Sequence, residues 1–514
     1  MKNNWIYFFV LIALLPVILL RDYTPGNELR YLSIADEAMR NGRWFAFTNH
    51  GIPYADKPPL YFWIIGMGKY LFGKHCMAFL SLFSLIPAFI IVGIMDRWTS
   101  GEIEKRYRLT WQLLMLSCGL FAGMTVVLRM DMLMCMFITL SLYTFYQMKK
   151  REGNQAVHTF LFPIFLFLAV FSKGPIGILI PLISTVTFLW LTGRIRTIGR
   201  YWGWKTWGIL LVCFAVWFVA VYAEGGWEYL HNLLFHQTLD RAVNSFHHEA
   251  PFYYYFLSIG YSLLPWSLLL IGILVTAICK KWIRTDLQKF FLTIVGVTFL
   301  LLSAISSKIA VYMLPAFPFI AYLALMYFHH LAWNRWLALS IAVPAIIFCL
   351  SLPALLGIAQ REDTHFLGQV LFRVAAGTLT LTGLLTLYLL YRRKDLNYAI
   401  RTLAYGLFGS IFIGGWALPR INSQLGYGDL CKQATTIAAT YHLSNYYVWK
   451  LYRPENIDVY LQKEVQTLSP EEPIQANLHN AVLMLPTGEV DGLPPCLSVR
   501  PIYKVGNYAI IPIP

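Results

Sequence analysis

The sequence predicts an α-helical protein that crosses a membrane many times. Of its 514 residues, 58% are hydrophobic and only 13% are charged. Apolar runs of roughly 17–25 residues, the length that spans the core of a bilayer, recur from Trp5 to about Leu418. The basic residues gather in short loops at alternate ends of successive runs. These observations exclude an ordinary soluble enzyme, and because the net charge of +15 is distributed in this way, no nucleic-acid partner is expected.

The apolar runs and the alternating loops together predict about thirteen transmembrane helices. Six loops, at 97–108, 149–151, 194–205, 280–289, 335 and 392–401, hold 20 of the 41 lysines and arginines. The positive-inside rule makes these loops cytoplasmic, so the N-terminus is inside and the C-terminus outside. The opening run lacks a small-residue cleavage site, so we interpret it as a retained helix and not as a cleaved signal peptide. The expected spans are 5–20, 78–95, 109–127, 130–147, 158–172, 174–192, 206–223, 253–278, 290–305, 309–328, 334–357, 371–391 and 399–418.

The first outer loop, 21–77, is expected to hold two helices at the membrane surface. Apolar residues recur at helical spacing over 29–39 with polar residues opposite, which predicts an amphipathic helix lying along the membrane. Asn27 is placed to cap its start and Gly42 to end it. The later run PPLYFWIIGMGKYLF, residues 58–72, is too short to cross and is expected to be interfacial or re-entrant.

The composition divides the chain into two expected domains. Residues 1–418 form the transmembrane domain. From Pro419 polar residues return, and runs such as DLCKQATTIAATYH and NAVLMLP predict a helix alternating with short strands. We therefore expect residues 419–514 to form a small α/β domain outside the membrane.

Ionisable and aromatic residues gather in segments that this topology assigns to the outer side. Asp131 borders the hydrocarbon region, where an acid is costly unless it has a partner or a task. Lys173 and Lys308 lie near span ends, where lysines also simply extend toward lipid headgroups. The candidate residues for substrate handling are Glu28, Arg30, Tyr31, Tyr54, Asp56, Lys57, Arg129, Asp131, Lys173, His236, Arg241, Lys308 and Tyr312.

Cations and acids clustered at a membrane edge suit a lipid phosphate. Lysine and arginine bind phosphate oxygens through charge-assisted hydrogen bonds, and an acid with a histidine can hold a divalent ion, zinc-like or magnesium. The phosphate would lie in the polar site while its lipid tail stays between the helices. The eight cysteines have no CxxC spacing and so indicate no metal or redox site of their own.

Six short stretches, in this order, resemble the bacterial lipid A aminoarabinose transferases. That family belongs to the GT-C class of membrane glycosyltransferases, which also includes the protein O-mannosyltransferases. The resemblance is close over 20–420 and loose in the C-terminal domain. It implies a GT-C fold in the bacterial inner membrane, with the active site and the C-terminal domain facing the periplasm. The stretches are NELRY, YADKPP, RMDML, FSKGP, HHEAPFYYY with LLPW, and SSKIAVYMLPAFP.

The resemblance also implies an activity and residue roles. The protein would transfer a sugar, such as aminoarabinose, from an undecaprenyl-phosphate donor to an envelope acceptor such as a lipid A phosphate. Lys57 and Arg241 would contact the donor phosphate. Asp56, where the family usually has glutamate, would bind a divalent metal together with His236. The other positions that the resemblance puts at the site are Arg30, Tyr31, Tyr54, Asp131, Lys173 and Tyr312.

One position departs from the family pattern, because Asn27 precedes Glu28 where the family has an aspartate. An amide cannot act as a general base, so transfer to a hydroxyl would need Glu28 or Asp131 as a substitute. A phosphate acceptor is already ionised and needs no base, which favours phosphate modification. The change is equally compatible with altered sugar recognition or an impaired enzyme. The candidate catalytic residues are Glu28, Lys57, Asp131 and Arg241.

Two alternative functions follow from the same features. The first is transfer of the sugar to protein or to another glycan. The second, from a different class, is a lipid or sugar transporter or flippase, which shares the many helices and the charges near the membrane. Transporters usually have paired repeats with interrupted helices at the midplane. Here the polar groups gather at one face and thirteen spans do not divide into two halves, so an enzyme is favoured.

Overall fold

The computed structural model of the protein describes residues 5–235, 249–328, 333–469 and 478–514. The chain forms two compact units, each described by itself below. The first unit comprises Met1–Leu15, Ala55–Tyr61 and Phe79–Ile413, and the second comprises Pro16–Tyr54, Phe62–Ala78 and Gly414–Pro514. The domain boundary at residue 418 rests on composition and stays a prediction.

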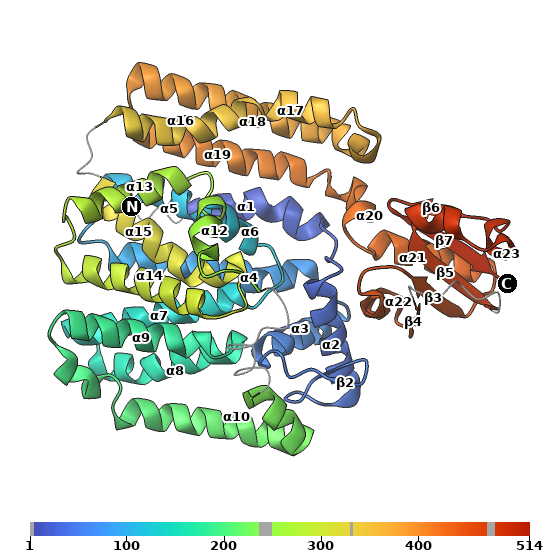
Figure 1. Cartoon of the computed structure of the whole chain (residues 1–514), viewed down its shortest axis with the longest axis horizontal. Helices are drawn as coiled ribbons and strands as arrows, with labels where there is room; N and C mark the ends of the chain where they lie inside the picture. Colours follow the sequence, from blue (N-terminus) through green and yellow to red (C-terminus); the bar gives the residue numbers. More distant parts are fainter. Residues whose placement is uncertain (1–4, 236–248, 329–332, 470–477) are drawn as a thin grey trace. The chain divides into compact units, whose positions relative to one another are not determined.

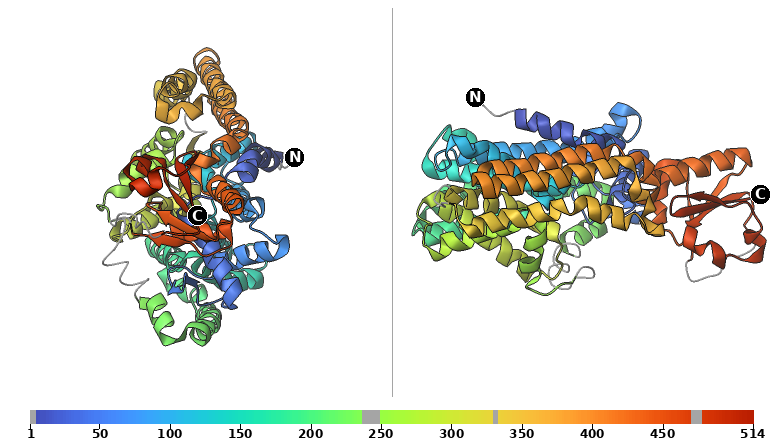
Figure 2. Two further views of the ribbon diagram at one scale, coloured as in Figure 1. Left: turned by 90° about the vertical axis from the view of Figure 1, so that its right-hand side faces the viewer. Right: turned by 90° about the horizontal axis from the view of Figure 1, so that it is seen from above.

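Apolar helices that run side by side build the first unit (Figures 1 and 2). In the part of the chain that the structure describes, seven helical segments are long and apolar enough to cross a membrane, and four shorter apolar helices accompany them. Every predicted span overlaps one or more helices, while the number that cross a membrane stays a prediction. The helices are α1 (Trp5–Leu20), α4 (Met77–Trp98), α5 (Arg108–Leu116), α6 (Gly119–Met124), α7 (Asp131–Lys150), α8 (Gln155–Lys173), α9 (Ile176–Leu191), α10 (Trp204–His231), α12 (Tyr254–Ser262), α13 (Ser267–Cys279), α14 (Asp286–Ala304), η4 (Ala310–Ala316), α15 (Phe317–Phe328), α16 (Arg335–Cys349), α17 (Ser351–Ile358), α18 (Val370–Tyr388) and α19 (Leu396–Gly415).

Capping residues fix where several of these helices begin. The Asn154 side chain accepts hydrogen bonds from two backbone amides in the first turn of α8. Thr285 and Gln288 form a reciprocal capping box at the start of α14. Each satisfies backbone N–H groups that a helix start leaves without a partner. Short helical turns connect some of the longer helices, at η1 (Lys105–Tyr107), η2 (Ile195–Arg200), η5 (Glu362–Gly368) and η6 (Leu389–Arg393).

Two of the predicted continuous spans, 109–127 and 253–278, are each broken into two helices. The two breaks lie against each other. The Gly119 amide donates to the Leu264 carbonyl at 2.6 Å, and the Trp266 indole donates to the Ser117 hydroxyl at 2.9 Å. A side chain on residue 119 would meet the Leu264 oxygen at 3.0 Å. The backbone groups that the breaks release are therefore partly satisfied by each other, which is how interrupted helices are tolerated inside a bilayer.

The second unit contains the predicted amphipathic helix as α2 (Asn27–Asn41). Gly42 ends it with a left-handed conformation at φ 66°, as expected. The prediction that Asn27 caps the helix is wrong, because Gly26 occupies that position and the Asn27 side chain accepts a hydrogen bond from Arg30 at 2.7 Å. A short hairpin, β1 (Thr48–Asn49) and β2 (Ile52–Pro53), follows, and the 58–72 run forms the thirteen-residue helix α3 (Leu60–Phe72).

The C-terminal part of the second unit is an α/β fold, as the sequence predicts. Five strands pair in the order β4-β3-β5-β7-β6. Neighbours β4, β3 and β5 are parallel, while β7 is antiparallel to β5 and β6. Figure 1 shows α21 packed beside this sheet. The elements are η7 (Leu418–Arg420), α20 (Asn422–Leu425), α21 (Gly428–Thr440), β3 (Asn445–Trp449), η8 (Pro454–Ile457), α22 (Asp458–Leu461), β4 (Gln466–Leu468), β5 (Ala481–Pro486), η9 (Thr487–Gly492), α23 (Pro495–Ser498), β6 (Tyr503–Val505) and β7 (Tyr508–Ile513).

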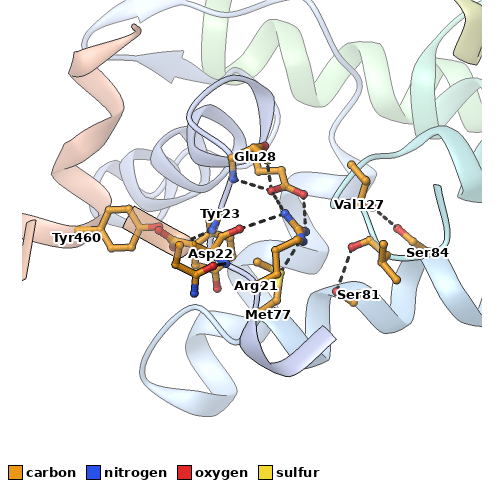
Figure 3. A network of polar contacts seen from close by, with 12 residues as sticks. Arg21, Asp22, Tyr23, Glu28, Met77, Ser81, Ser84, Val127 and Tyr460 are labelled. Carbon is orange, nitrogen blue, oxygen red and sulfur yellow. Dashed lines mark hydrogen bonds and ion pairs between the residues drawn. The ribbon is translucent and has the colours of Figure 1, made fainter. Parts of the chain in front are cut away.

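A polar network joins the residues after the first apolar helix to the α/β fold (Figure 3). The Asp22 carboxylate accepts hydrogen bonds from the Tyr460 hydroxyl and from the Gly428 amide. Burial raises the pKa of Asp22, and these hydrogen bonds offset only part of that effect. A side chain on Gly426 would collide with this carboxylate, since its Cβ would lie 2.2 Å from an Asp22 oxygen. Glycine is therefore required at that position for the close approach.

Candidate functional site

A cavity of about 490 Å³ in the first unit brings several predicted site residues together. Asp56, Lys57, Lys173 and Tyr312 all contribute to its lining, along with Ser307. They come from the segment before α3, from the end of α8 and from the η4 region, which are far apart in sequence. The structure thus gathers these predicted residues around one hollow.

A buried ion-pair cluster anchors one of the cavity lysines. Asp131 begins α7, is fully buried, and pairs with both the Lys173 ammonium and the Arg129 guanidinium, the latter at 3.0 Å. Its position in the first helical turn also suits the positive end of the helix dipole. Because one carboxylate oxygen contacts each cation, Asp131 is engaged on both sides. Asp131 is therefore placed to orient the Lys173 side chain.

The backbone around Lys173 explains how its side chain reaches the cavity. Lys173 is the last residue of α8, and Gly174 follows with φ 114°. A side chain on Gly177 would lie 2.4 Å from the Ala169 carbonyl carbon, so glycine there lets α9 start tight against α8. The Lys173 ammonium lies 4.5 Å from the centre of the Tyr312 ring, a cation–π contact. Lysine and tyrosine are therefore held as a pair at the cavity wall.

Lys57 has a different local partner. Its ammonium lies 3.2 Å from the Asp56 carboxylate and 3.2 Å from the Asp56 carbonyl oxygen. Taken with Lys173, Arg129 and Asp131, the residues that the structure describes here include three cations and two carboxylates. Their summed charge is positive and would attract an anionic group.

The rest of the cavity is largely apolar, and three aromatic side chains of one helix contribute to it. Phe214, Trp217 and Phe218 project from one face of α10, and their i, i+3 and i+4 spacing puts them together. Trp217 and Phe218 lie 5.0 Å apart between ring centres. Val170, Ile178, Leu179, Leu302 and Ile305 complete most of the apolar wall. A polar end with two lysines and an apolar remainder suit an amphiphilic ligand with an anionic head.

One further candidate in the first unit, Lys308, is satisfied by backbone oxygens. Lys308 is buried, and its ammonium donates to the Ala250 carbonyl oxygen at 2.9 Å. His236 and Arg241 lie outside the described residues. The expected metal pair of Asp56 with His236 therefore stays a prediction. Within the residues that are described, no three histidine, cysteine or acidic side chains come together as a metal-binding group.

Four predicted residues, Glu28, Arg30, Tyr31 and Tyr54, belong to the second unit. The Glu28 carboxylate is buried and accepts two hydrogen bonds from Arg21, at 2.6 and 2.8 Å, and two from Thr24 (Figure 3). Arg30 lies between Tyr31 and Tyr54, 5.8 and 5.5 Å from their ring centres. Glu28 is thus held by the chain that precedes its own helix.

Two further acids in the second unit have opposite electrostatic environments. Burial acts to raise the pKa of Asp36, but His75 and Lys69, both 2.7 Å from its carboxylate, more than compensate and lower that pKa. Burial raises the pKa of Asp458, and the nearby His50 and the Ser33 hydroxyl offset only part of the effect. Asp36 is therefore stabilised as an anion, and Asp458 is not.

Sequence reasoning missed two parts of this arrangement. The sequence analysis places Arg21 in the first outer loop and gives it no role, although an arginine seven residues before Glu28 could have been weighed as its partner. The aromatic wall on α10 was hidden among the many aromatic residues of the spans. Its i, i+3, i+4 spacing was a usable signal, but the same spacing is common on lipid-facing helices.

These features define a polytopic helical membrane protein of the GT-C fold class with a small C-terminal sheet domain. The structure superposes on ArnT from Cupriavidus metallidurans in its crystal structure with undecaprenyl phosphate, with a TM-score of 0.77 over 99% of this chain and 98% of that one, at 16% identity. This likeness defines the fold.

In sequence, the chain is similar to proteins named undecaprenyl phosphate-alpha-4-amino-4-deoxy-L-arabinose arabinosyl transferase. The protein of Shewanella sediminis is 26% identical over 321 residues, which cover 60% of this chain and 56% of that protein. The protein of Edwardsiella ictaluri is 25% identical over 447 residues, 81% of this chain and 77% of that one. The match thus spans less than two thirds of the Shewanella protein. No family model matches the sequence.

Proposed function

We propose that this protein is an integral membrane glycosyltransferase that moves an aminoarabinose-like sugar from a polyprenyl-phosphate donor to an envelope acceptor such as a lipid A phosphate. The observation that carries the proposal is the amphiphilic cavity, with Lys57 and Lys173 at its polar end and a wall of aliphatic and aromatic side chains along the rest. The names of the sequence relatives and the bound undecaprenyl phosphate of the similar structure support this choice of donor.

The chemistry follows from what the cavity residues can bind. When the glycosidic bond to the donor breaks, negative charge grows on the leaving polyprenyl phosphate. Lys57 and Lys173 stabilise that charge through charge-assisted hydrogen bonds. Asp131 and Tyr312 hold the Lys173 ammonium in position, so little reorganisation is needed during the reaction. The apolar wall retains the lipid tail and keeps water away from the leaving group.

The acidic residues favour an acceptor that needs no general base. Asp131 is engaged by two cations and Glu28 by Arg21 and Thr24, so both candidate bases are committed to other partners. A phosphate acceptor is ionised at neutral pH and attacks without deprotonation. We therefore favour transfer to a lipid A phosphate over transfer to a protein or glycan hydroxyl.

A divalent ion is compatible with part of the site. The Asp56 carboxylate is a suitable ligand for such an ion, and it lies beside Lys57 at the polar end of the cavity. A bound ion would add to the neutralisation of the leaving phosphate. The second expected ligand, His236, lies outside the described residues, so the steps above rely on the lysines alone.

The test is a transfer assay with the purified full-length protein in detergent. The donor is undecaprenyl-phosphate aminoarabinose, the acceptor is lipid A, and the product is detected by mass spectrometry. We expect lipid A to gain one aminoarabinose group on a phosphate. Because detergent removes the second compartment, product formation contradicts a transporter or flippase. Transfer only to a protein or glycan would overturn the choice of acceptor. If no acceptor receives the sugar, the proposal that the protein is a glycosyltransferase is overturned.

We further propose that the cavity and the α/β fold face the periplasm of a bacterial inner membrane. The support is the alternation of basic loops along the sequence. Reporter fusions after Lys150 and Lys281 should then report a cytoplasmic location, and fusions after His50 and Ser469 a periplasmic one. A cytoplasmic reporter signal after Ser469 would contradict this orientation.

A further inference from the structure

A second hollow, separate from the cavity, lies between the first turns of α8 and α10. This groove has a volume of about 700 Å³. Figure 1 shows the two helices beside each other, and they pack in the first unit. The groove is lined by Gln155, Ala156, Thr159, Phe160, Trp204, Lys205, Gly208, Ile209, Val212 and Cys213. From Trp204 to Cys213 it follows α10 for about 13 Å, at a rise of 1.5 Å per residue.

Most of the polar side chains in the groove are already used within the chain. The Thr159 hydroxyl donates to the Gln155 carbonyl oxygen at 2.8 Å, and the Gln155 amide donates to the Glu152 carbonyl oxygen at 2.8 Å. Lys205 differs, because no carboxylate in the described residues lies within ion-pair distance of it, and its ammonium lies only over the neighbouring Trp204 ring at 5.8 Å. The groove therefore pairs an apolar floor with one charge that the described residues do not neutralise.

The basic residues near the groove increase this imbalance. Arg196 and Arg200 are exposed in η2, just before α10, and no described acidic side chain pairs with them. Arg194 differs, since it pairs with Asp286 at 2.8 Å. The charge at this end of α10 is thus positive and exposed, next to the exposed Trp204, a residue type typical of the headgroup region.

We propose that this groove binds one anionic phospholipid. The lipid phosphate contacts Lys205, and one acyl chain lies between Phe160 and Val212. Gly208 supports this arrangement, because no atom lies within 4 Å of where its side chain would begin, so the missing side chain leaves the groove open. The charge complementarity selects an anionic lipid over a zwitterionic one. This site is independent of the proposed transferase activity, since none of its residues lines the 490 Å³ cavity.

The test measures lipid retention by native mass spectrometry. Full-length protein is reconstituted with phosphatidylglycerol or phosphatidylcholine, released into detergent, and its bound lipids are counted over a range of lipid concentrations. Lys280→Ala is the matched control, because Lys280 is also exposed and lies 5.2 Å from a tryptophan ring, that of Trp282, but does not line the groove. Wild type and Lys280→Ala should prefer phosphatidylglycerol.

The groove variants should separate the contributions of charge and shape. Lys205→Ala should weaken phosphatidylglycerol binding about fivefold, the effect of one cation near a lipid surface, without changing phosphatidylcholine binding. Gly208→Phe fills the groove and should abolish retention of both lipids. If that variant fails to fold, Val212→Trp, at a position 60% exposed, obstructs the same groove.

Several results would overturn the proposal. They are a wild type without preference for phosphatidylglycerol, an equal loss in Lys280→Ala, full retention when the groove is filled, and displacement of the lipid by millimolar inorganic phosphate. An equal loss in the control would mean that the basic surface attracts lipid without a site. Displacement by inorganic phosphate would mean that the acyl chain contributes nothing.

Discussion

Asp131 in the first unit and Glu28 in the second are both buried carboxylates paired with an arginine. Their other contacts differ. Asp131 also holds Lys173, a residue of the cavity wall, whereas Glu28 also holds Thr24, in the loop that precedes its helix. The same ion-pair chemistry thus orients a cavity residue in one unit and fixes a chain turn in the other. A buried acid in a membrane protein therefore has to be interpreted through its partners, and burial by itself does not show which role it has.

The largest expected effect separates these two acids. Asp131→Asn and Glu28→Gln each remove one member of a buried ion pair, which costs about 3–5 kcal/mol of stability. Only Asp131→Asn should also reduce transfer per folded molecule, on the order of a hundredfold, because Lys173 loses its orientation. The measurement is kcat for the monodisperse fraction of each variant, alongside its thermal unfolding. A hundredfold loss of kcat in Glu28→Gln would contradict the comparison.

The next effect tests Lys57 as a phosphate ligand. Lys57→Ala removes a charge-assisted contact of about 1.5–3 kcal/mol, so kcat/KM for the donor should fall roughly ten- to over a hundredfold. Folding should persist, because the ammonium pairs with the neighbouring Asp56 at a partly exposed position. Lys280→Ala, an exposed lysine away from the cavity, is the control. Near-normal transfer by Lys57→Ala would show that Lys57 only extends to the headgroups.

A smaller effect is expected at the apolar wall. Trp217→Ala removes the central aromatic residue of α10 from the cavity, and affinity for a long-chain polyprenyl donor should fall about tenfold. A donor analogue with a short, water-soluble chain should bind as it does to wild type. Val219→Ala, at an exposed position on the same helix, is the control. Equal losses for both donors would mean that the wall supports the fold and not the lipid tail.

The smallest effects concern the pH dependence of stability at two acids of the second unit, Asp36 and Asp458. Ionisation should stabilise the fold at Asp36 and destabilise it at Asp458. The lowered pKa of Asp36 means that its stabilisation is present above about pH 3.9 and is lost as the pH falls further toward the folded-state pKa. The raised pKa of Asp458 means that its stabilisation is present below about pH 3.9 and is lost as the pH rises through the higher folded-state pKa.

These signs can be tested by the thermal unfolding of the full-length protein against pH. Asp36→Asn should lower Tm at pH 7, and the difference should shrink below about pH 4. Asp458→Asn should raise Tm at pH 7 and make no difference below about pH 4. If Tm changes with pH in the same way in both variants, the opposite electrostatic environments of Asp36 and Asp458 are contradicted.

The sequence predicted the helical class, a helical segment within every span and the terminal α/β fold, because apolar length and period are local properties. It did not predict the breaks at Ser117 and Leu264, since each break is satisfied by the other one, nearly 150 residues away in the chain. Asn27 was misassigned as a helix cap for a similar reason, because its side chain is taken by Arg30.

The site was predictable as a set of residues but not as a geometry. Lys57, Lys173 and Tyr312 were found by their topological side and by resemblance, and they do line one cavity. The pairing of Asp131 with Lys173 joins the starts and ends of different helices, and no local pattern encodes it. The roles of these residues, and those of His236 and Arg241, stay predictions.

The contacts of Asp22 impose an order on how this protein folds during its synthesis. Its partners Gly428 and Tyr460 lie 406 and 438 residues further along the chain, so they emerge from the ribosome long after Asp22 does. Until they arrive, an acid that will be buried has to stay hydrated, since a buried carboxylate without partners is costly. The beginning of the second unit is therefore completed last. A chain that stops after its last apolar helix retains all the described cavity residues. It would nevertheless lack the two residues that hydrogen-bond the Asp22 carboxylate.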